Sequence, residues 1–484
     1  MKIVLFALNG SYAHSSLSVR ALTAALGEAG FSPYTVEGNL RERTLTLLQR
    51  LYEQDADLYG FSCYIWNLDL MLELAESLKA LRPHCRILFG GPEASFATER
   101  FTRLPFIDHV IAGEGEVAIV TLASALAAGK DAPRLLEGTP DPKFTQRGIL
   151  YDKSAPVAPL VYYESARGCP FSCAFCLSGR AAIPGDSAHR VRAKSAEKAL
   201  ADLADFEAFP APLTVKLVDR TFNFDRERAK RIWRGLLSPT YTKCYHFEIA
   251  AHLLDEESYA ILSQFPKDKI RLEIGLQSTN PQTLAAISRH TDAACVLESA
   301  RRLTAQTNCH VHLDLIAGLP HEDMASLARS FDAAYPCCDV LQLGFLKLLH
   351  GTPLRERAAD FGAVFEQKSP YTVLKTDVIS FEEMLGLHRI SDLMERLRDS
   401  GRFAESLPFI LSHLPSPFRF YAEFDGYLST KTGKELQKTS QRDLFWHLSQ
   451  FAKEKLPEDL HEALSASLRA DYTAAEVRRP PKGL

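Results

Sequence analysis

The sequence predicts an α/β protein in three parts: an N-terminal doubly wound domain, a partial (β/α)6 barrel of the TIM type, and a mainly α-helical C-terminal domain. Short apolar runs alternate with helical patterns over residues 1–140 and again over 160–355. Such alternation indicates parallel sheets covered by helices. From residue 356 the pattern becomes that of amphipathic helices. A chain of 484 residues is also too long for one ordinary core.

The N-terminal domain is expected to be flavodoxin-like (Rossmann-like) and to cover residues 1–140, with a Pro-containing linker over 141–159. Gly30 is a suitable C-cap for its first helix. We expect strands at Ile3–Leu8, Leu58–Ser62, Arg86–Gly90 and Val110–Ala112, and helices at Leu17–Ala29, Leu68–Leu81 and Val117–Ala128.

The loops after these strands are candidates for ligand binding, because ligands of such sheets bind beyond the carboxyl ends of the strands. Glycine there lets the backbone approach a ligand closely, although turns also need glycine. The candidate residues in these loops are Asn9, Ser62, Tyr64, Trp66, Gly90, Gly91, Glu93, Gly113 and Gly115.

Three cysteines in one short segment are the strongest chemical signal in the chain. Cys169, Cys173 and Cys176 have the spacing Cys-x3-Cys-x2-Cys. Three thiolates at this spacing can bind three irons of a [4Fe–4S] cluster and leave the fourth iron open, whereas a cluster is normally completed by a fourth cysteine. The open iron would accept a small molecule directly.

Two other interpretations of these cysteines are weaker. A structural zinc site uses four ligands, usually in paired groups, and this segment contains only the pair Cys173 and Cys176. A disulfide framework is not expected in a long chain with ten scattered cysteines and no export signal.

The barrel, expected over residues 160–355, has charged residues within or just after its apolar strands. A charge in such a strand is costly to bury without a partner, so charges on successive strands indicate a shared polar interior, although some can be structural. Chemistry in barrels of this type gathers at the C-terminal strand ends. The expected strands are Leu160–Glu164, Thr214–Asp219, Tyr245–Ala250, Ile270–Leu276, His310–Ile316 and Val340–Leu346, and the candidate residues near their ends are Asp219, Glu248, Glu273 and Asp314.

The cysteine triplet, with Phe175 before its third cysteine, resembles the radical S-adenosylmethionine (SAM) family. The glycine loops of the first domain resemble the cobalamin-binding (B12-binding) domain that precedes many radical SAM domains. The first loop lacks the motif that supplies a histidine to cobalt in the wider cobalamin family, and His14 is expected to be an ordinary loop histidine. Tyr64 and Trp66 are open to two interpretations, as a stack against the lower corrin face or as aromatics that cap the core.

The resemblance implies roles for residues along the barrel. Phe175 would pack near the adenine of SAM, and the region from Asp219 through Thr221 to Phe222 would meet its methionine amine. Other residues expected to contact SAM are Glu248, Glu273, Gln277, Ser278, Ile316 and Gly318. Arg190 and Arg192 are expected either to pair with a carboxylate or phosphate or to form a solvated approach to the next helix.

The resemblance implies a cobalamin-dependent radical SAM enzyme with a [4Fe–4S] cluster, SAM and cobalamin. Reductive cleavage of SAM would give a 5′-deoxyadenosyl radical, followed by methylcobalamin-dependent C-methylation of a weakly activated carbon. The alternatives are radical rearrangement, cyclisation or tRNA modification without methyl transfer, and a non-catalytic iron–sulfur or cobalamin sensor. The substrate, small or macromolecular, is not identified by the sequence.

Composition narrows the expected partners and location. The formal net charge of −4 gives no broad basic field for nucleic acid or anionic membrane. The apolar N-terminus is too short for a membrane span, and ten cysteines without a signal peptide favour a cytoplasmic location. An electron donor such as flavodoxin or ferredoxin is the expected protein partner. In the C-terminal domain, we expect helices at Phe381–Leu397 and Asp443–Lys455, and the aromatic run at 416–427 is expected either to pack as core or to close the barrel.

Overall fold

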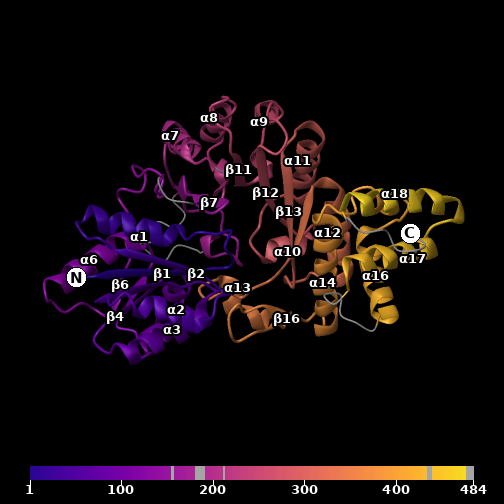
Figure 1. Ribbon diagram of the computed structural model, residues 1–484. Coiled ribbons are helices and arrows are strands. Elements are labelled where there is room, and N and C mark those ends of the chain that lie inside the picture. The colour runs from indigo at the N-terminus through magenta and orange to yellow at the C-terminus, as the bar shows by residue number, and fades with distance from the viewer. Residues whose placement is uncertain (154–156, 180–190, 211–212, 433–438, 476–484) are drawn as a thin grey trace.

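The computed structural model describes residues 1–153, 157–179, 191–210, 213–432 and 439–475. Figure 1 shows three parts side by side, with the N-terminal domain at the left, the barrel in the middle and the C-terminal helices at the right. The predicted fold class is confirmed by two parallel sheets and by the helices that follow them.

The sheet of the N-terminal domain is parallel, and its described strands have the order β2-β1-β3-β4-β5-β6. This order places β3 and β4 at its centre, and the residues of β1, β3 and β4 are buried on both faces over most of their length. The strands are β1 (Ile3–Asn9), β2 (Tyr34–Asn39), β3 (Leu58–Ser62), β4 (Arg86–Gly90), β5 (His109–Ala112) and β6 (Leu135–Glu137).

Helices cover both faces of this sheet, as Figure 1 shows. Alternate side chains of β1 point to opposite faces, so Leu5 packs with α1 and α6 while Phe6 packs with α2 and α3. Ser16 caps α1 by accepting a hydrogen bond from the Val19 amide. The helices are α1 (Leu17–Glu28), α2 (Thr44–Tyr52), α3 (Leu68–Leu81), α4 (Pro92–Phe96), α5 (Thr98–Thr102) and α6 (Gly115–Ala127).

The barrel is an open parallel sheet whose described strands have the order β14-β13-β12-β11-β10-β7. Its core strands alternate between buried residues on the helix-covered face and half-buried residues on the inner face, as in β13. The strands are β7 (Leu160–Tyr163), β10 (Thr214–Leu217), β11 (Cys244–Ile249), β12 (Ile270–Gln277), β13 (His310–Ala317) and β14 (Val340–Phe345); a small antiparallel pair, β8 (Ala166–Arg167) and β9 (Arg192–Ala193), follows β7.

The helices between the barrel strands lie on the outer face of the sheet (Figure 1). Ser195, Asp225, Asp255, Asp292 and Asp323 cap the N-termini of α7, α8, α9, α11 and α12 through side-chain hydrogen bonds. The bounds are α7 (Ala196–Asp205), α8 (Arg226–Leu236), α9 (Glu256–Leu262), α10 (Pro281–Ala286), α11 (Ala293–Gln306), α12 (Met324–Ala334) and α13 (Pro353–Glu356).

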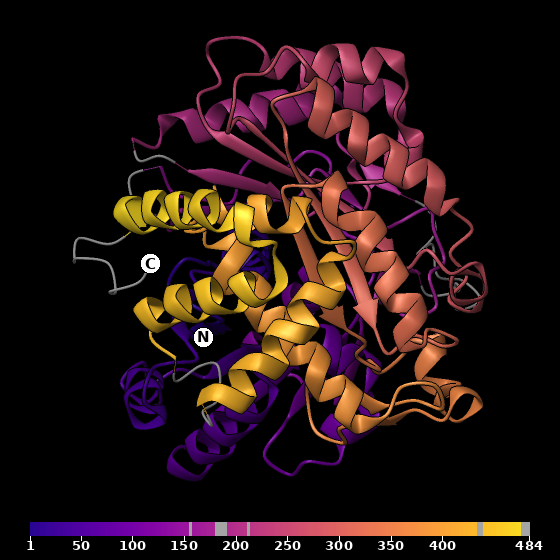
Figure 2. The ribbon, with the colours of Figure 1, turned by 90° about the vertical axis from the view of Figure 1, so that its right-hand side faces the viewer.

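The C-terminal helices pack on the β13–β14 side of the barrel, in front in Figure 2. Their apolar residues, from Met384 to Tyr472, belong to one hydrophobic core with those of the barrel. The aromatic run at 416–427 lies in α16 and is largely buried in this core. The elements are β15 (Val364–Phe365), β16 (Val373–Lys375), α14 (Phe381–Met394), α15 (Ser406–Ser412), α16 (Pro417–Thr432), α17 (Gln441–Lys455) and α18 (His461–Ala475).

Some elements were not predicted from the sequence. The strand β2 is an edge strand with a half-exposed pattern, and α2 has no side-chain cap. The hairpin β15–β16 interrupts a segment that was expected to be mainly helical. None of the helices in the described ranges is long and apolar enough to cross a membrane.

Candidate functional site

The three cysteines lie on the loop that follows β8, at the C-terminal end of the barrel's first strand. Cys169 and Cys173 are buried, and Cys176 is half-buried. The Cys176 amide donates a hydrogen bond to the Cys173 carbonyl over 3.1 Å, which folds this part of the loop into a turn. Phe175 packs against the hydrophobic core.

Asp219 fixes the start of this loop. Its fully buried carboxylate accepts hydrogen bonds from the Ser165 amide at 2.7 Å and the Ala166 amide at 2.9 Å, and also from the Ser165 hydroxyl. The Arg228 guanidinium donates to the same hydroxyl over 2.6 Å. The structure therefore directs Asp219 at the cysteine loop, whereas the sequence prediction directed it at the methionine amine of SAM.

Two side chains from other elements reach the sulfurs. The Thr221 hydroxyl lies 3.5 Å from Cys169 Sγ, and Arg289 Nη1 lies 3.7 Å from Cys173 Sγ. Burial raises the pKa of the Cys173 thiol, while the Arg289 charge acts in the opposite direction. Arg289 was missed by sequence reasoning because only the folded chain brings residue 289 to the cysteine loop.

The inner face of the barrel carries a cluster of charges. Glu273 accepts from Lys216 Nζ at 2.8 Å and lies 3.0 Å from His246 Nε2, and Lys216 is also 3.7 Å from Glu248. Parallel register explains the cluster, since Lys216 pairs with His246 and Glu248 with Glu273 on neighbouring strands. The sequence analysis identified the two glutamates but missed Lys216 and His246.

The pKa values of these acids diverge. Burial opposes ionisation of Glu273, but the nearby His246 ring and the charge of Lys216 lower its pKa to about 2. Burial, with the negative charges of Glu273 and Glu248, raises the pKa of Asp314 to about 7. Within the described chain, Asp314 Oδ1 is buried and has no hydrogen-bond partner. Perturbed acids in a polar interior are typical of functional sites.

The remaining predicted barrel residues take different positions. Gln277 is buried at the end of β12 with a positive φ of 72°. The Ser278 hydroxyl donates to buried Glu322. Ile316 is half-buried against the core, and a side chain at Gly318 would meet Met384 and Val373 of the C-terminal part.

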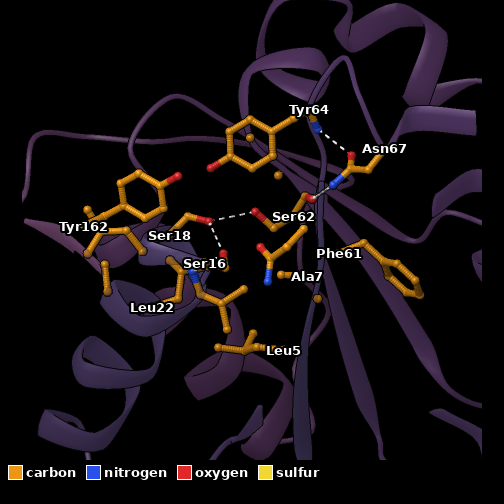
Figure 3. A pocket seen from close by; sticks show the side chains of 18 of the residues that line it. Leu5, Ala7, Ser16, Ser18, Leu22, Phe61, Ser62, Tyr64, Asn67 and Tyr162 are labelled. Atoms are coloured by element: carbon orange, nitrogen blue, oxygen red, sulfur yellow. Dashed lines mark hydrogen bonds between the residues drawn. The ribbon is translucent and has the colours of Figure 1, made fainter. Parts of the chain in front are cut away.

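A cavity of about 700 Å³ lies between the N-terminal sheet and the barrel mouth, and its volume is within the range of cofactor sites, roughly 300–1,000 Å³. Its base is apolar, with Leu5, Ala7 and Leu22, and its rim carries hydroxyl groups (Figure 3). The predicted loop residues that line it are Asn9, Ser62, Tyr64, Trp66, Gly90, Gly91, Gly113 and Gly115, and the barrel contributes Tyr162, Glu164, Arg167, Val218 and Arg220.

Side chains around this cavity are held by specific contacts. Ser18 and Ser62 are hydrogen-bonded over 2.8 Å, as Figure 3 shows. The rings of Tyr64 and Trp66 stack with centroids 4.4 Å apart. His14 Nδ1 lies 2.6 Å from the Tyr162 hydroxyl, so this histidine has a partner from the barrel.

Glu93 and Arg192 both form contacts within the protein. Glu93 does not line the cavity; it is buried and accepts a hydrogen bond from the Tyr371 hydroxyl over 2.7 Å. Arg192 pairs with a carboxylate of the protein itself, Glu114. Arg190 and the chain end at 476–484 lie outside the described residues.

In this structure, the glycine loops of the N-terminal sheet face the mouth of a barrel that carries three cysteines on one loop. This arrangement is typical of a class of proteins with two cofactors, which combine cobalamin with radical SAM chemistry. Comparison with protein families supports this class. The family models "B12 binding domain", "Radical SAM superfamily" and "Protein of unknown function (DUF4080)" match residues 4–123, 163–334 and 359–483 in turn. Residues 4–123 thus match the B12-binding domain, and residues 163–334 match the radical SAM superfamily.

Individual relatives point the same way. The chain is 26% identical over 306 residues to 2-(S-pantetheinyl)-carbapenam-3-carboxylate methyltransferase of Streptantibioticus cattleyicolor, covering 56% of this chain and 44% of the relative. It is 26% identical over 311 residues to the cobalamin-dependent radical SAM methyltransferase TokK of Streptomyces tokunonensis, covering 57% and 44%. The chain thus matches less than half the length of these relatives.

A solved structure has the same fold. The radical SAM methyltransferase TsrM of Kitasatospora setae, with cobalamin and a [4Fe–4S] cluster bound, superposes with a TM-score of 0.62 at 15% identity, over 98% of this chain and 99% of TsrM. The cofactors of the matched domains are cobalamin for the first and a [4Fe–4S] cluster with SAM for the second, so the predicted cofactor set is confirmed at the level of the domains.

The residues present fit these groups. Thiolates are the usual ligands of iron–sulfur clusters, and the three thiols lie on one loop beside a guanidinium. In the described chain, no three His, Cys, Asp or Glu side chains gather at one ion position; cluster cysteines each bind a different iron and need not meet at one point. At the cavity, Gly91 has a φ of 103°, and its backbone borders the space without a side chain.

Proposed function

We propose that this protein is a cobalamin-dependent radical SAM methyltransferase that adds a methyl group to a weakly activated carbon. One observation carries the proposal: a cavity is walled on one side by the glycine and serine loops of the N-terminal domain and on the other by the barrel mouth, where the lining residue Arg167 lies two positions before Cys169. When bound, the cluster and SAM would supply a carbon-centred radical, and cobalamin would supply the methyl group.

Different residues of the chain have different proposed roles. Cys169, Cys173 and Cys176 would hold the cluster, and Phe175 would lie beside the adenine. Asp219 positions the loop through Ser165 and Ala166. The roles proposed for Thr221, Glu248, Glu273, Gln277, Ser278, Ile316 and Gly318 are contacts to SAM or support of its pocket.

The polar interior would also orient a cationic ligand. SAM carries a sulfonium and an ammonium group, and the buried carboxylate of Asp314 has an oxygen with no partner in the described chain. A cation that approached this oxygen would favour its ionised form. The packed walls around the site would keep water and stray thiols from a reactive intermediate.

On the N-terminal side, the apolar base and the hydroxyl rim of the cavity suit a large ligand with both apolar and amide surfaces. Ser62 and Ser18 present hydroxyls at the rim, and the stacked Tyr64 and Trp66 present a flat aromatic surface. We assign this surface to the corrin. An electron donor of the flavodoxin or ferredoxin type is the proposed protein partner.

The test needs no substrate. Protein reconstituted without oxygen, with iron, sulfide and hydroxocobalamin, is reduced and given SAM with a labelled methyl group. We expect 5′-deoxyadenosine and labelled methylcobalamin, both identified by mass spectrometry. Retained 5′-deoxyadenosine with no corrin bound and no label transferred would contradict methyl transfer, and absence of both products would contradict the whole proposal.

A further inference from the structure

Arg167 occupies a position between the two proposed cofactor sites. It lies two residues before Cys169, on β8, and its side chain lines the cavity of the N-terminal domain. The side chain is 17% exposed, so its charge is largely removed from water and requires partners.

Three carboxylates supply those partners. Arg167 Nη1 donates to Glu114 at 2.8 Å, Nη2 to Glu116 at 2.6 Å, and Nε to Glu164 at 2.8 Å. Burial disfavours the charged guanidinium, but Glu164, Glu116 and Glu114 raise the pKa of Arg167 above its usual value. All the donor nitrogens of the guanidinium are therefore engaged, which fixes its plane and not only its position.

The partners come from both domains. Glu114 and Glu116 belong to the loop between β5 and the first turn of α6, where their neighbours Gly113 and Gly115 line the cavity. Glu164 follows β7 of the barrel. The Arg167 side chain thus connects the loop at residues 113–116 of the N-terminal domain to the segment that leads into the cysteine loop.

Neighbouring contacts stiffen the connection. Arg192 pairs with Arg167 in the β8–β9 ladder and binds Glu114 from the other side. The Phe144 ring lies under the Arg167 guanidinium, with the centroid 4.6 Å away. Gly138 must be glycine for close packing, because a Cβ there would lie 2.1 Å from the Glu114 carbonyl.

We propose that Arg167 is a positioning residue that sets the separation between the cobalamin-binding loop and the cluster-binding loop. The inference rests on the proposed function, because this separation matters when one substrate must be reached from both cofactors. A misplacement of about 1 Å in such an arrangement can cost roughly 100-fold in rate.

The experiment measures the separation directly. Reconstituted protein is reduced to the paramagnetic cob(II)alamin and [4Fe–4S]⁺ states, and the distance between the two spins is determined by pulsed electron paramagnetic resonance. We expect one narrow distribution in the unmodified protein, a broad or shifted one in Arg167→Gln, and an intermediate one in Arg167→Lys, which keeps the charge but loses the fork. Glu116→Gln tests the same contact from the other domain.

The matched control is Arg302→Gln. Arg302 also binds a carboxylate, Glu256, through two nitrogens and lies over an aromatic ring, Tyr259, but it is on α11, away from both loops. It is expected to leave the distance unchanged. An unchanged distribution in folded Arg167→Gln and Glu116→Gln, or equal broadening in the control, would overturn the proposal.

A second readout is independent of cobalamin. Amide hydrogen exchange is followed at residues 113–117 and 165–169, and we expect both segments to exchange faster together in Arg167→Gln. If the unmodified protein binds no cobalamin, the proposed function fails, while this readout still decides whether Arg167 couples the loops. Faster exchange in one segment only would contradict the coupling.

Discussion

The N-terminal wall of the cavity and the inner wall of the barrel differ in how they handle charge. On the N-terminal side, the lining consists of glycines, hydroxyl groups and apolar side chains, and its acids Glu114 and Glu116 are paired with Arg167. On the inner face of the barrel, away from the cavity lining, charged groups crowd together, and the pKa values of Glu273 and Asp314 shift in opposite directions. The first wall suits a large ligand recognised by shape, and the second suits a small ligand recognised by charge.

The largest effect is expected from a variant that removes the cluster and leaves cobalamin binding intact. Cys173→Ala removes one proposed cluster ligand, so iron content and 5′-deoxyadenosine formation should fall to background while cobalamin binding remains. Iron analysis, visible absorption and mass spectrometry measure these quantities. Cys295→Ser is the control, because Cys295 is exposed and outside the loop. Loss of cobalamin together with iron would show that the two sites are not independent.

A large side chain in the N-terminal wall of the cavity should weaken cobalamin binding and leave the cluster in place. Ser62→Phe places a large side chain in the cavity, and overpacking of about 3 kcal/mol corresponds to roughly 100-fold weaker cobalamin binding. Ser62→Ala removes only the hydrogen bond to Ser18, so its loss should stay near tenfold or less, about 1 kcal/mol. Titration with hydroxocobalamin measures both. Equal affinities in the two variants would mean that cobalamin binds elsewhere.

Removing one charge from the inner face of the barrel should lower the free energy of unfolding. Lys216→Met removes the ammonium group that lies 2.8 Å from Glu273 and leaves the ring of His246 beside the carboxylate, and we expect a loss of about 2 kcal/mol at pH 7 by urea unfolding. Glu273 has a lowered pKa in the folded protein, so its contribution is present above pH 4.5 and is lost as the pH falls toward 2. The difference between Lys216→Met and the unmodified protein should therefore shrink in acid.

An ion pair that is more exposed to solvent provides the control for this prediction. Lys143 pairs with Glu28, but its side chain is 58% exposed, so Lys143→Met should cost under about 1 kcal/mol. A loss in Lys216→Met no greater than in Lys143→Met would mean that the barrel interior is well solvated.

The smallest effect concerns Asp314. Its pKa is raised in the folded protein, so folding binds a proton there and stability falls as the pH rises from about 4 toward 7. Asp314→Asn cannot ionise and should remove this pH dependence. Unfolding measured at several pH values tests the slope, and an unchanged slope would mean that Asp314 is already paired or hydrated.

The sequence was most informative where local pattern and function coincide. The six barrel strands were predicted to within about two residues, because each combines an apolar run with a polar end. The strand β2 was missed because its sequence, at the sheet edge, alternates weakly. Fold class follows from periodicity, whereas edge elements depend on tertiary pairing.

Side-chain partners were less predictable than elements. Lys216, His246 and Arg289 reach the site through strand register and long-range packing, which no spacing in one sequence reveals. Asp219 shows the converse, since its place at a strand end was recognised but its direction was not. A strand end can present a carboxylate to the barrel interior or to the next loop, and only the fold decides between them.

The anchoring of the cysteine loop by Asp219 has a consequence for maturation. The Ser165 and Ala166 amides donate to this carboxylate, and these bonds join protein atoms alone. They can therefore form as the polypeptide folds, so the segment that leads into Cys169 does not depend on iron or sulfide for its shape. Loss of the inorganic core through oxidation would leave these bonds in place for a replacement.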